Sequence, residues 1–95
     1  MIVYLNEFAP VIGDVSIADR ILRIIGDSIK KEDIVTVDFT TIRVIATNCA
    51  KHIFGKLYIA LGSEQFFSRI VISNASENVK VSIMNGIEAA LQEER

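Results

Sequence analysis

The chain of 95 residues contains one cysteine and one proline, and its apolar runs are short. A helix that crosses a bilayer needs about 20 consecutive apolar residues, and no run here approaches that length. The start, MIVYLNEF, lacks the basic segment and the small-residue cleavage site of a secretory signal. The lone Cys49 excludes an internal disulfide framework and a zinc site built from several cysteines. We therefore expect a soluble, cytoplasmic protein with no membrane contact.

The chain also lacks an excess of basic residues. Ten lysines and arginines stand against twelve acidic residues, which gives a net charge of −2. Nucleic-acid-binding proteins usually carry a basic stripe, because neutralising phosphates supplies most of their affinity. The basic residues here are dispersed along the chain. We therefore expect no nucleic-acid partner.

Apolar residues, in contrast, are plentiful. They make up 51% of the sequence, against 23% charged residues, and the mean hydropathy is +0.39. This composition is typical of a folded chain rather than a disordered one. A chain of this length supports one core and buries about 60–65% of its unfolded surface. We therefore expect a single domain over residues 1–95, with little chain left to form a deep catalytic cleft.

Three apolar, β-branched runs predict buried strands over residues 2–5, 34–39 and 69–73. Residues 40–46 have a strand-like composition, but we expect them to form a loop that packs inward. Strands that alternate with helical segments indicate right-handed crossovers. We therefore expect an α/β fold of βαβαβα order, with a mainly parallel sheet of three or four strands and helices packed on it. Such a sheet has two edges and can keep one face uncovered, so a homodimer is compatible with it.

Between and after these strands, apolar residues recur at the spacing of one helix face. The first helix is expected to begin at Ser16 and the third at Asn74, because both residues can cap a first turn and an acidic residue follows three positions later. For the second helix, Thr47 and Asn48 are both candidate caps. We expect this helix to end at Gly62.

The sequence carries no strong catalytic signature. Gly55-Lys56 is followed by leucine, and the first strand–helix turn holds only Gly13, so neither a P-loop nor a dinucleotide fingerprint is present. Cys49 and His52 share one face of the second expected helix, but two ligands do not complete a tetrahedral zinc site. We interpret them as a buried small residue beside a partly exposed histidine. We therefore expect no enzyme activity, no cofactor and no metal.

Asp38 ends the second expected strand, where a carboxylate has two contrasting interpretations. In response-regulator receivers such an aspartate is the phosphoacceptor, but the acidic pair and the lysine that this chemistry needs are missing here. We therefore interpret Asp38 as an anchor that accepts backbone hydrogen bonds from the loop at 40–43. An alternative function uses the crevice beyond the carboxyl ends of the strands, the usual site of a nucleotide or small ligand. That crevice would be lined by Asp38, Thr40, Ser73 and Asn74.

Residues 37–48 resemble the signature of STAS domains, the fold of bacterial anti-sigma factor antagonists. That signature is an aliphatic strand, Asp-Phe-Ser-Gly-Val, a short interval, and Asp-Ser-Ser-Gly opening a helix. The corresponding segments are Val37-Asp38-Phe39-Thr40-Thr41-Ile42 and Val44-Ile45-Ala46-Thr47-Asn48. A closer resemblance, over about residues 13–92, is to a small STAS-like family of uncharacterised function. It is carried by Ser16, Asp38-Phe39, Asn48-Cys49-Ala50-Lys51-His52, Phe54-Gly55 and Ile70-Val71-Ile72-Ser73-Asn74.

The resemblance implies a role through protein contact rather than catalysis. In anti-sigma factor antagonists, a partner kinase of the GHKL ATPase type phosphorylates a serine at the start of the second helix. The added charge of about −1.5 to −2 then switches a contact surface. By gapless spacing Asn48 occupies the position of that serine, and asparagine cannot be phosphorylated. Thr47 is the nearest hydroxyl and so the candidate phosphoacceptor.

We therefore predict a regulatory, non-enzymatic module of signal transduction. It would dock a partner protein, such as a GHKL-type ATPase or kinase, through the loop and the start of the second helix. The candidate contact residues are Thr41, Thr47, Asn48, Lys51 and His52.

Overall fold

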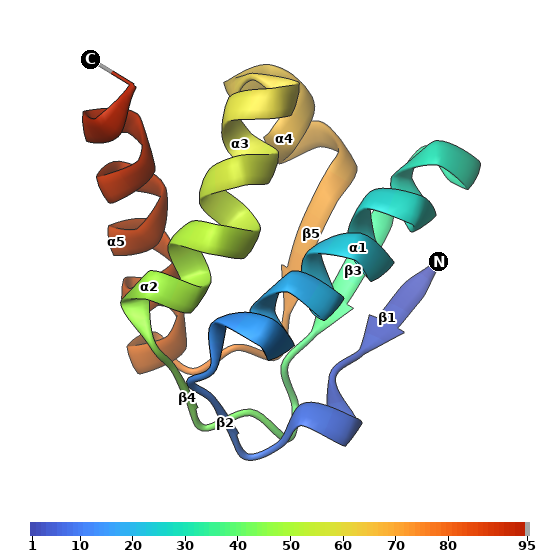
Figure 1. Ribbon diagram of the computed structural model, residues 1–95. Coiled ribbons are helices and arrows are strands. Elements are labelled where there is room, and N and C mark those ends of the chain that lie inside the picture. The colour runs from blue at the N-terminus through green and yellow to red at the C-terminus, as the bar shows by residue number, and fades with distance from the viewer. Residues whose placement is uncertain (95) are drawn as a thin grey trace.

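The computed structural model describes residues 1–94 of the chain (Figure 1). Its main sheet consists of β1 (Ile2–Tyr4), β3 (Val35–Asp38) and β5 (Ile70–Ser73), in the spatial order β1-β3-β5. Both pairings are parallel, and Val37 of the central strand lies opposite Val3 on one side and Ile72 on the other. The predicted α/β class and the mainly parallel sheet are confirmed.

A second, smaller sheet lies next to the carboxyl ends of these strands. A 3-10 turn, η1 (Asn6–Phe8), follows β1 and leads to β2 (Val11–Ile12), which pairs in parallel with β4 (Val44–Ile45). The expected loop at 40–46 does pack inward, because Ile42 and Ile45 are buried. Its last part is nevertheless a strand, and treating the whole segment as a loop was wrong. Two-residue strands are too short for an alternating pattern to reveal them.

The first and last helices begin at residues other than the expected ones. α1 (Val15–Lys31) is capped by Asp14, whose Oδ1 accepts hydrogen bonds of 2.8 Å from both the amide and the hydroxyl of Ser16. α5 (Glu77–Glu93) is capped by Ser76, whose hydroxyl accepts a bond of 3.2 Å from the Val79 amide. The predicted caps at Ser16 and Asn74 are therefore wrong by two residues each. In both cases a nearby Asp or Ser side chain reaches the free amides instead.

The middle helical segment is more divided than predicted. It runs through α2 (Thr47–Ala50), the π-helical turn η2 (Lys51–Gly55) and α3 (Lys56–Leu61). Ala46 is the N-cap and no side chain caps the first turn, so the capping roles predicted for Thr47 and Asn48 are wrong. Gly62 does end α3, with a φ of 82°, but a further helix that the sequence analysis missed, α4 (Ser63–Arg69), leads into β5.

The helices form one layer against one face of the main sheet (Figure 1). The two crossovers, β1 to β3 and β3 to β5, step in the same direction, and right-handed connections then place α1 and α2–α3 on the same face. Phe39 and Phe54 pack in the core between the layers, with ring centroids 6.0 Å apart. None of the helices within residues 1–94 combines the length and the apolar character needed to span a bilayer.

α5 and η2 pack backbone against backbone. A Cβ atom at Gly86 would lie 2.5 Å from the Lys51 nitrogen and 2.7 Å from the Ala50 carbonyl carbon. A Cβ atom at Gly55 would lie 2.6 Å from the Cβ of Ala90. Real Cβ atoms essentially never show contacts this short, so glycine is required at both crossing points. This close approach sets the position of α5 beside the middle helical segment.

We expect Gly86→Ala to destabilise the fold by about 1–3 kcal/mol, the usual cost of overpacking a well-packed interior. The added methyl group would meet backbone atoms, which cannot rotate away. Gly26→Ala is the matched control, because a Cβ there meets nothing within 4 Å, and we expect it to stabilise the helix by up to about 1 kcal/mol. Urea denaturation measures both changes, and equal stability of the two variants would contradict the close packing.

Candidate functional site

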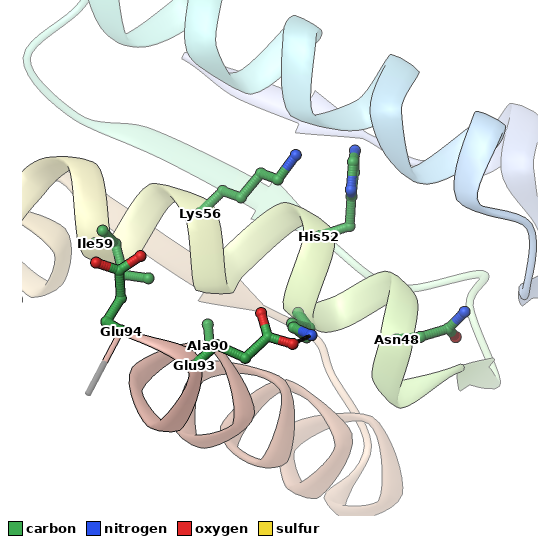
Figure 2. Close-up of a pocket in the computed structure, with 8 residues that line it drawn as sticks. Asn48, His52, Lys56, Ile59, Ala90, Glu93 and Glu94 are labelled. Atoms are coloured by element: carbon green, nitrogen blue, oxygen red, sulfur yellow. Dashed lines mark hydrogen bonds and ion pairs between the residues drawn. The ribbon is translucent and has the colours of Figure 1, made fainter.

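Three of the predicted contact residues line one hollow. Asn48, Lys51 and His52 border a space of about 350 Å³ between the middle helical segment and α5 (Figure 2). We call this space the α2–α5 groove. Its full lining is Asn48, Lys51, His52, Lys56, Ile59, Ala90, Glu93 and Glu94.

The other two predicted contact residues lie outside the groove. Thr47 is the exposed first residue of α2, directly before the groove residue Asn48. Thr41 lies in the loop between β3 and β4, and its hydroxyl bonds to Asn6 Oδ1 at 3.2 Å. The structure therefore joins Asn48, Lys51 and His52, with Thr47 beside them, and ties Thr41 to the η1 turn instead.

Neighbouring side chains of η2 reach in opposite directions. Lys51 forms an ion pair with Glu93 of α5. His52 Nε2 lies 3.1 Å from Asp19 Oδ1 of α1, and the other oxygen of Asp19 lies 2.9 Å from Arg23. The hydrogen bond with His52 holds the pKa of Asp19 below its usual range, and the charge of Arg23 acts in the same direction. The middle segment is thus connected to both flanking helices by polar side chains.

The turn that carries Lys51 and His52 is wider than an α-helical one. The Lys56 amide donates to the Lys51 carbonyl, five residues back, which is the π-helical bond. Ile53, Phe54 and Gly55 are all buried, because this turn packs against α1 and α5 at once. Single π turns within α-helices are frequent at functional sites. Apart from the glycine at position 55, the sequence held no signal for this turn.

Two groove side chains keep free hydrogen-bonding groups. Asn48 and Lys56 are exposed and lie along the groove wall formed by the middle segment (Figure 2). Over residues 1–94, neither side chain takes part in a hydrogen bond or an ion pair. Their polar groups can therefore bond to a partner without breaking an internal hydrogen bond or ion pair.

Cys49 and His52 have separate environments. Cys49 is fully buried, and this burial raises the pKa of its thiol, which keeps it protonated and unreactive. His52 borders the groove, but its imidazole points away from α5 toward Asp19 of α1 (Figure 2). Among the residues that the structure describes, no group of three or more His, Cys, Asp or Glu side chains is placed to hold a metal ion.

Asp38 joins the ends of two strands. It ends β3, is 7% exposed, and accepts bonds of 2.8 Å from the Thr40 hydroxyl and from the Asn74 amide. These bonds hold the pKa of Asp38 below its usual range. The bond from Asn74 has the largest effect, the bond from the Thr40 hydroxyl comes next, and the Thr40 backbone amide contributes less. The main donors are therefore side chains, one of them after β5, rather than the predicted loop amides. Asp38, Thr40 and Asn74, three of the residues predicted to line a ligand crevice, do lie together. Their polar groups, however, are hydrogen-bonded to one another.

We expect the Asp38 carboxyl to titrate below the usual value of about 3.9 in carboxyl-carbon NMR. Asn74→Gly removes the amide donor, while glycine still adopts the left-handed φ of 58° found at this position, so the pKa should rise. Ionised Asp38 thus contributes stability that is complete above about pH 4 and is lost as the pH falls through its lowered pKa. Asn85→Ala, an exposed change on α5, is the control and should leave the titration unchanged. An equal Asp38 pKa in wild type and Asn74→Gly would contradict this assignment.

Comparison with known proteins gives one family match. Residues 18–80, more than half of the chain, match a STAS-like domain of unknown function (DUF4325). No curated protein and no solved structure matches the chain. The matched region runs from α1 to the first turn of α5 and includes Asp38, the π turn and Asn74. The chain therefore belongs to the family of STAS-like domains of unknown function.

Proposed function

We propose that this chain is a regulatory, non-enzymatic module that docks a partner protein through the α2–α5 groove and the start of α2. The observation that carries the proposal is the meeting of Asn48, Lys51 and His52 in one solvent-open hollow. The resemblance to anti-sigma factor antagonists supports a docking surface at the start of this helix. The same resemblance makes a GHKL-type ATPase or kinase the partner class that we propose.

The distribution of charge in the groove supports a protein partner with side chains of both signs. Lys51, His52 and Lys56 lie on the wall formed by the middle segment, and Glu93 and Glu94 lie on the wall formed by α5. Opposed charges of this kind fix the orientation of a partner more than they add affinity. In the ion pair between Lys51 and Glu93, the Glu93 side chain is 65% exposed and the Lys51 side chain 33%, and ion pairs that solvent reaches contribute only about 0–1 kcal/mol. A partner can therefore replace it at small cost.

The position of Thr47 supports a charge switch beside the groove. Thr47 is exposed at the first turn of α2, and it is not the capping residue. A phosphate there would be stabilised by the free amides and the dipole of the helix start, so the fold would tolerate it. Its charge of about −1.5 to −2 would nevertheless change the surface next to Asn48. We therefore propose Thr47 as the phosphoacceptor, because Asn48 stands where antagonists have serine.

We expect Lys56→Glu and Asn48→Arg each to weaken binding to the captured partner by about tenfold or more, since one reverses a charge in the groove and the other fills part of it. The partner is captured from host extract with wild-type chain, purified, and titrated by calorimetry. Lys31→Glu, at the exposed end of α1, makes the same charge change outside the groove and should leave affinity unchanged. Equal affinity for wild type and both groove variants would contradict the proposed docking surface.

We expect Thr47→Glu to reduce affinity for the same partner, whereas Thr47→Val keeps it, because only the first adds a negative charge. Intact-mass measurement of chain purified from its host should show a fraction heavier by one phosphate, and Thr47→Val should lose that fraction. A phosphate that persists in Thr47→Val would assign the modification to another residue. Equal affinity of the Glu and Val variants would exclude the charge switch.

A further inference from the structure

Asn85 and Gly86 form a chemically reactive pair on α5. Of the five asparagines in the chain, Asn85 is the one that a glycine follows. The backbone nitrogen after an asparagine can attack the side-chain amide carbon, and a glycine hinders this attack least, because it has no side chain and its backbone turns freely. Asn85 is exposed, and within residues 1–94 its side-chain amide takes part in no hydrogen bond. The sequence and the exposure of Asn85 therefore both favour loss of its amide nitrogen.

The packing of α5 requires the glycine of this pair. A Cβ atom at position 86 would lie 2.5 Å from the Lys51 nitrogen and 2.8 Å from the Ala50 Cβ, so no other residue type fits at this crossing. Residue 85 is exposed and has no such constraint. The fold therefore keeps a reactive glycine at the contact that positions α5 beside the middle helical segment.

The closed structure keeps the two reacting atoms apart. Both residues lie in the middle of α5, where ψ stays near −42° and each amide donates to the carbonyl four residues earlier. To attack the side chain of Asn85, the Gly86 nitrogen must lose its proton and swing out of this geometry. Gly86 cannot do so in place, because the backbone of Ala50 and Lys51 lies against it. The reaction therefore requires α5 to separate first from the middle helical segment.

We propose that Asn85 is a deamidation site that reacts only when α5 leaves its place against the middle helical segment. In the opened chain the Gly86 nitrogen bonds to Cγ of Asn85, and the carbon–nitrogen bond of the side-chain amide breaks. The side-chain nitrogen takes up the proton of the Gly86 amide and leaves as ammonia, so that a cyclic imide remains. One water molecule then opens the imide, to aspartate when the bond from Cγ to nitrogen breaks and to isoaspartate when the bond from the backbone carbonyl carbon breaks.

The isoaspartate product does not fit the closed structure. Its backbone runs through Cβ and Cγ of residue 85, which inserts one extra carbon before Gly86. Gly86 then falls out of register with the Lys51 nitrogen, at a contact that leaves no room for a shift. The part of α5 beyond this point carries Ala90 and Glu93 of the groove wall. Deamidation to isoaspartate therefore removes one wall of the α2–α5 groove permanently, whatever binds there.

Peptide mapping by mass spectrometry tests the site, with wild-type chain kept in mildly alkaline buffer with and without urea. In urea we expect Asn85 to deamidate faster than the four asparagines that precede larger residues, Asn6, Asn48, Asn74 and Asn78. Without urea the Asn85 rate should fall by at least about tenfold, the factor that an opening free energy of about 1.4 kcal/mol gives. An equal Asn85 rate in the two buffers would overturn the proposal, as would equal rates at all five asparagines in urea.

Two glycine variants test whether the position of α5 controls the reaction. Gly55→Ala places a methyl group 2.6 Å from the Ala90 Cβ, so it loosens the contact of α5 and leaves the reactive pair unchanged. We expect it to speed deamidation of Asn85 without urea by about fivefold or more, and to leave the rate in urea unchanged. Gly26→Ala, whose Cβ meets nothing within 4 Å, is the matched control and should not speed the reaction.

Circular dichroism checks that Gly55→Ala is folded; if it is not, Ala90→Gly takes its place, because glycine weakens α5 through its low helix propensity. A wild-type deamidation rate in the folded variant would overturn control by α5.

The stability of the product tests its effect on the fold. Chain aged in urea is returned to native buffer, and its isoaspartate fraction is separated by chromatography. We expect this fraction to unfold at a lower urea concentration than fresh chain. Asn85→Asp adds the charge at an exposed position without the extra backbone carbon, so it should keep the wild-type midpoint. Equal midpoints for the isoaspartate chain and Asn85→Asp would contradict the loss of the groove wall.

Discussion

The backbone contact between α5 and the π turn holds the candidate site in place. Gly86 lies against the nitrogen of Lys51, and Lys51 is both the first residue of the π turn and a groove residue. The distance between the two walls of the groove is therefore set by main-chain atoms, which cannot rotate away as side chains can. With those walls fixed, Lys51 reaches Glu93 on one side while His52 reaches Asp19 on the other.

The two layers of the molecule present surfaces of opposite character. The helical side carries the charged α2–α5 groove, where the side chains of Asn48 and Lys56 make no hydrogen bond or ion pair within residues 1–94. The other side of the main sheet exposes the apolar side chains of Ile2, Tyr4 and Val71, beside the carboxylate of Asp38. A surface with mixed charges suits a partner that must bind in one orientation.

Much of the architecture was predictable because the long elements have strong periodicity. The cores of β1, β3 and β5 and the stripes of α1 and α5 follow from their apolar spacing. α4 was missed because Gly62 does end α3 but also starts the next helix, and residues 63–69 show no stripe of their own. The π turn packs against Gly86, a residue distant in sequence, and no local sequence pattern predicts it.

The candidate site was predictable only where its residues are neighbours in sequence. Asn48, Lys51 and His52 are close in sequence on one helix, so their meeting needed no knowledge of tertiary structure. The opposite wall of the groove, with Ala90 and Glu93, comes from a helix about 40 residues later and could not be placed. Likewise, Asp38 was identified as an anchor, but its partner Asn74 becomes a neighbour only through the pairing of β3 with β5.

Hydrogen exchange of the chain, free and bound to the partner that it captures, tests the central claim most directly. Docking through the α2–α5 groove predicts slower exchange in α2, in α3 and in the last turns of α5, with β1, β3 and β5 of the main sheet unchanged. Protection confined to β1, β3 and β5, with the groove amides unaffected, would contradict it.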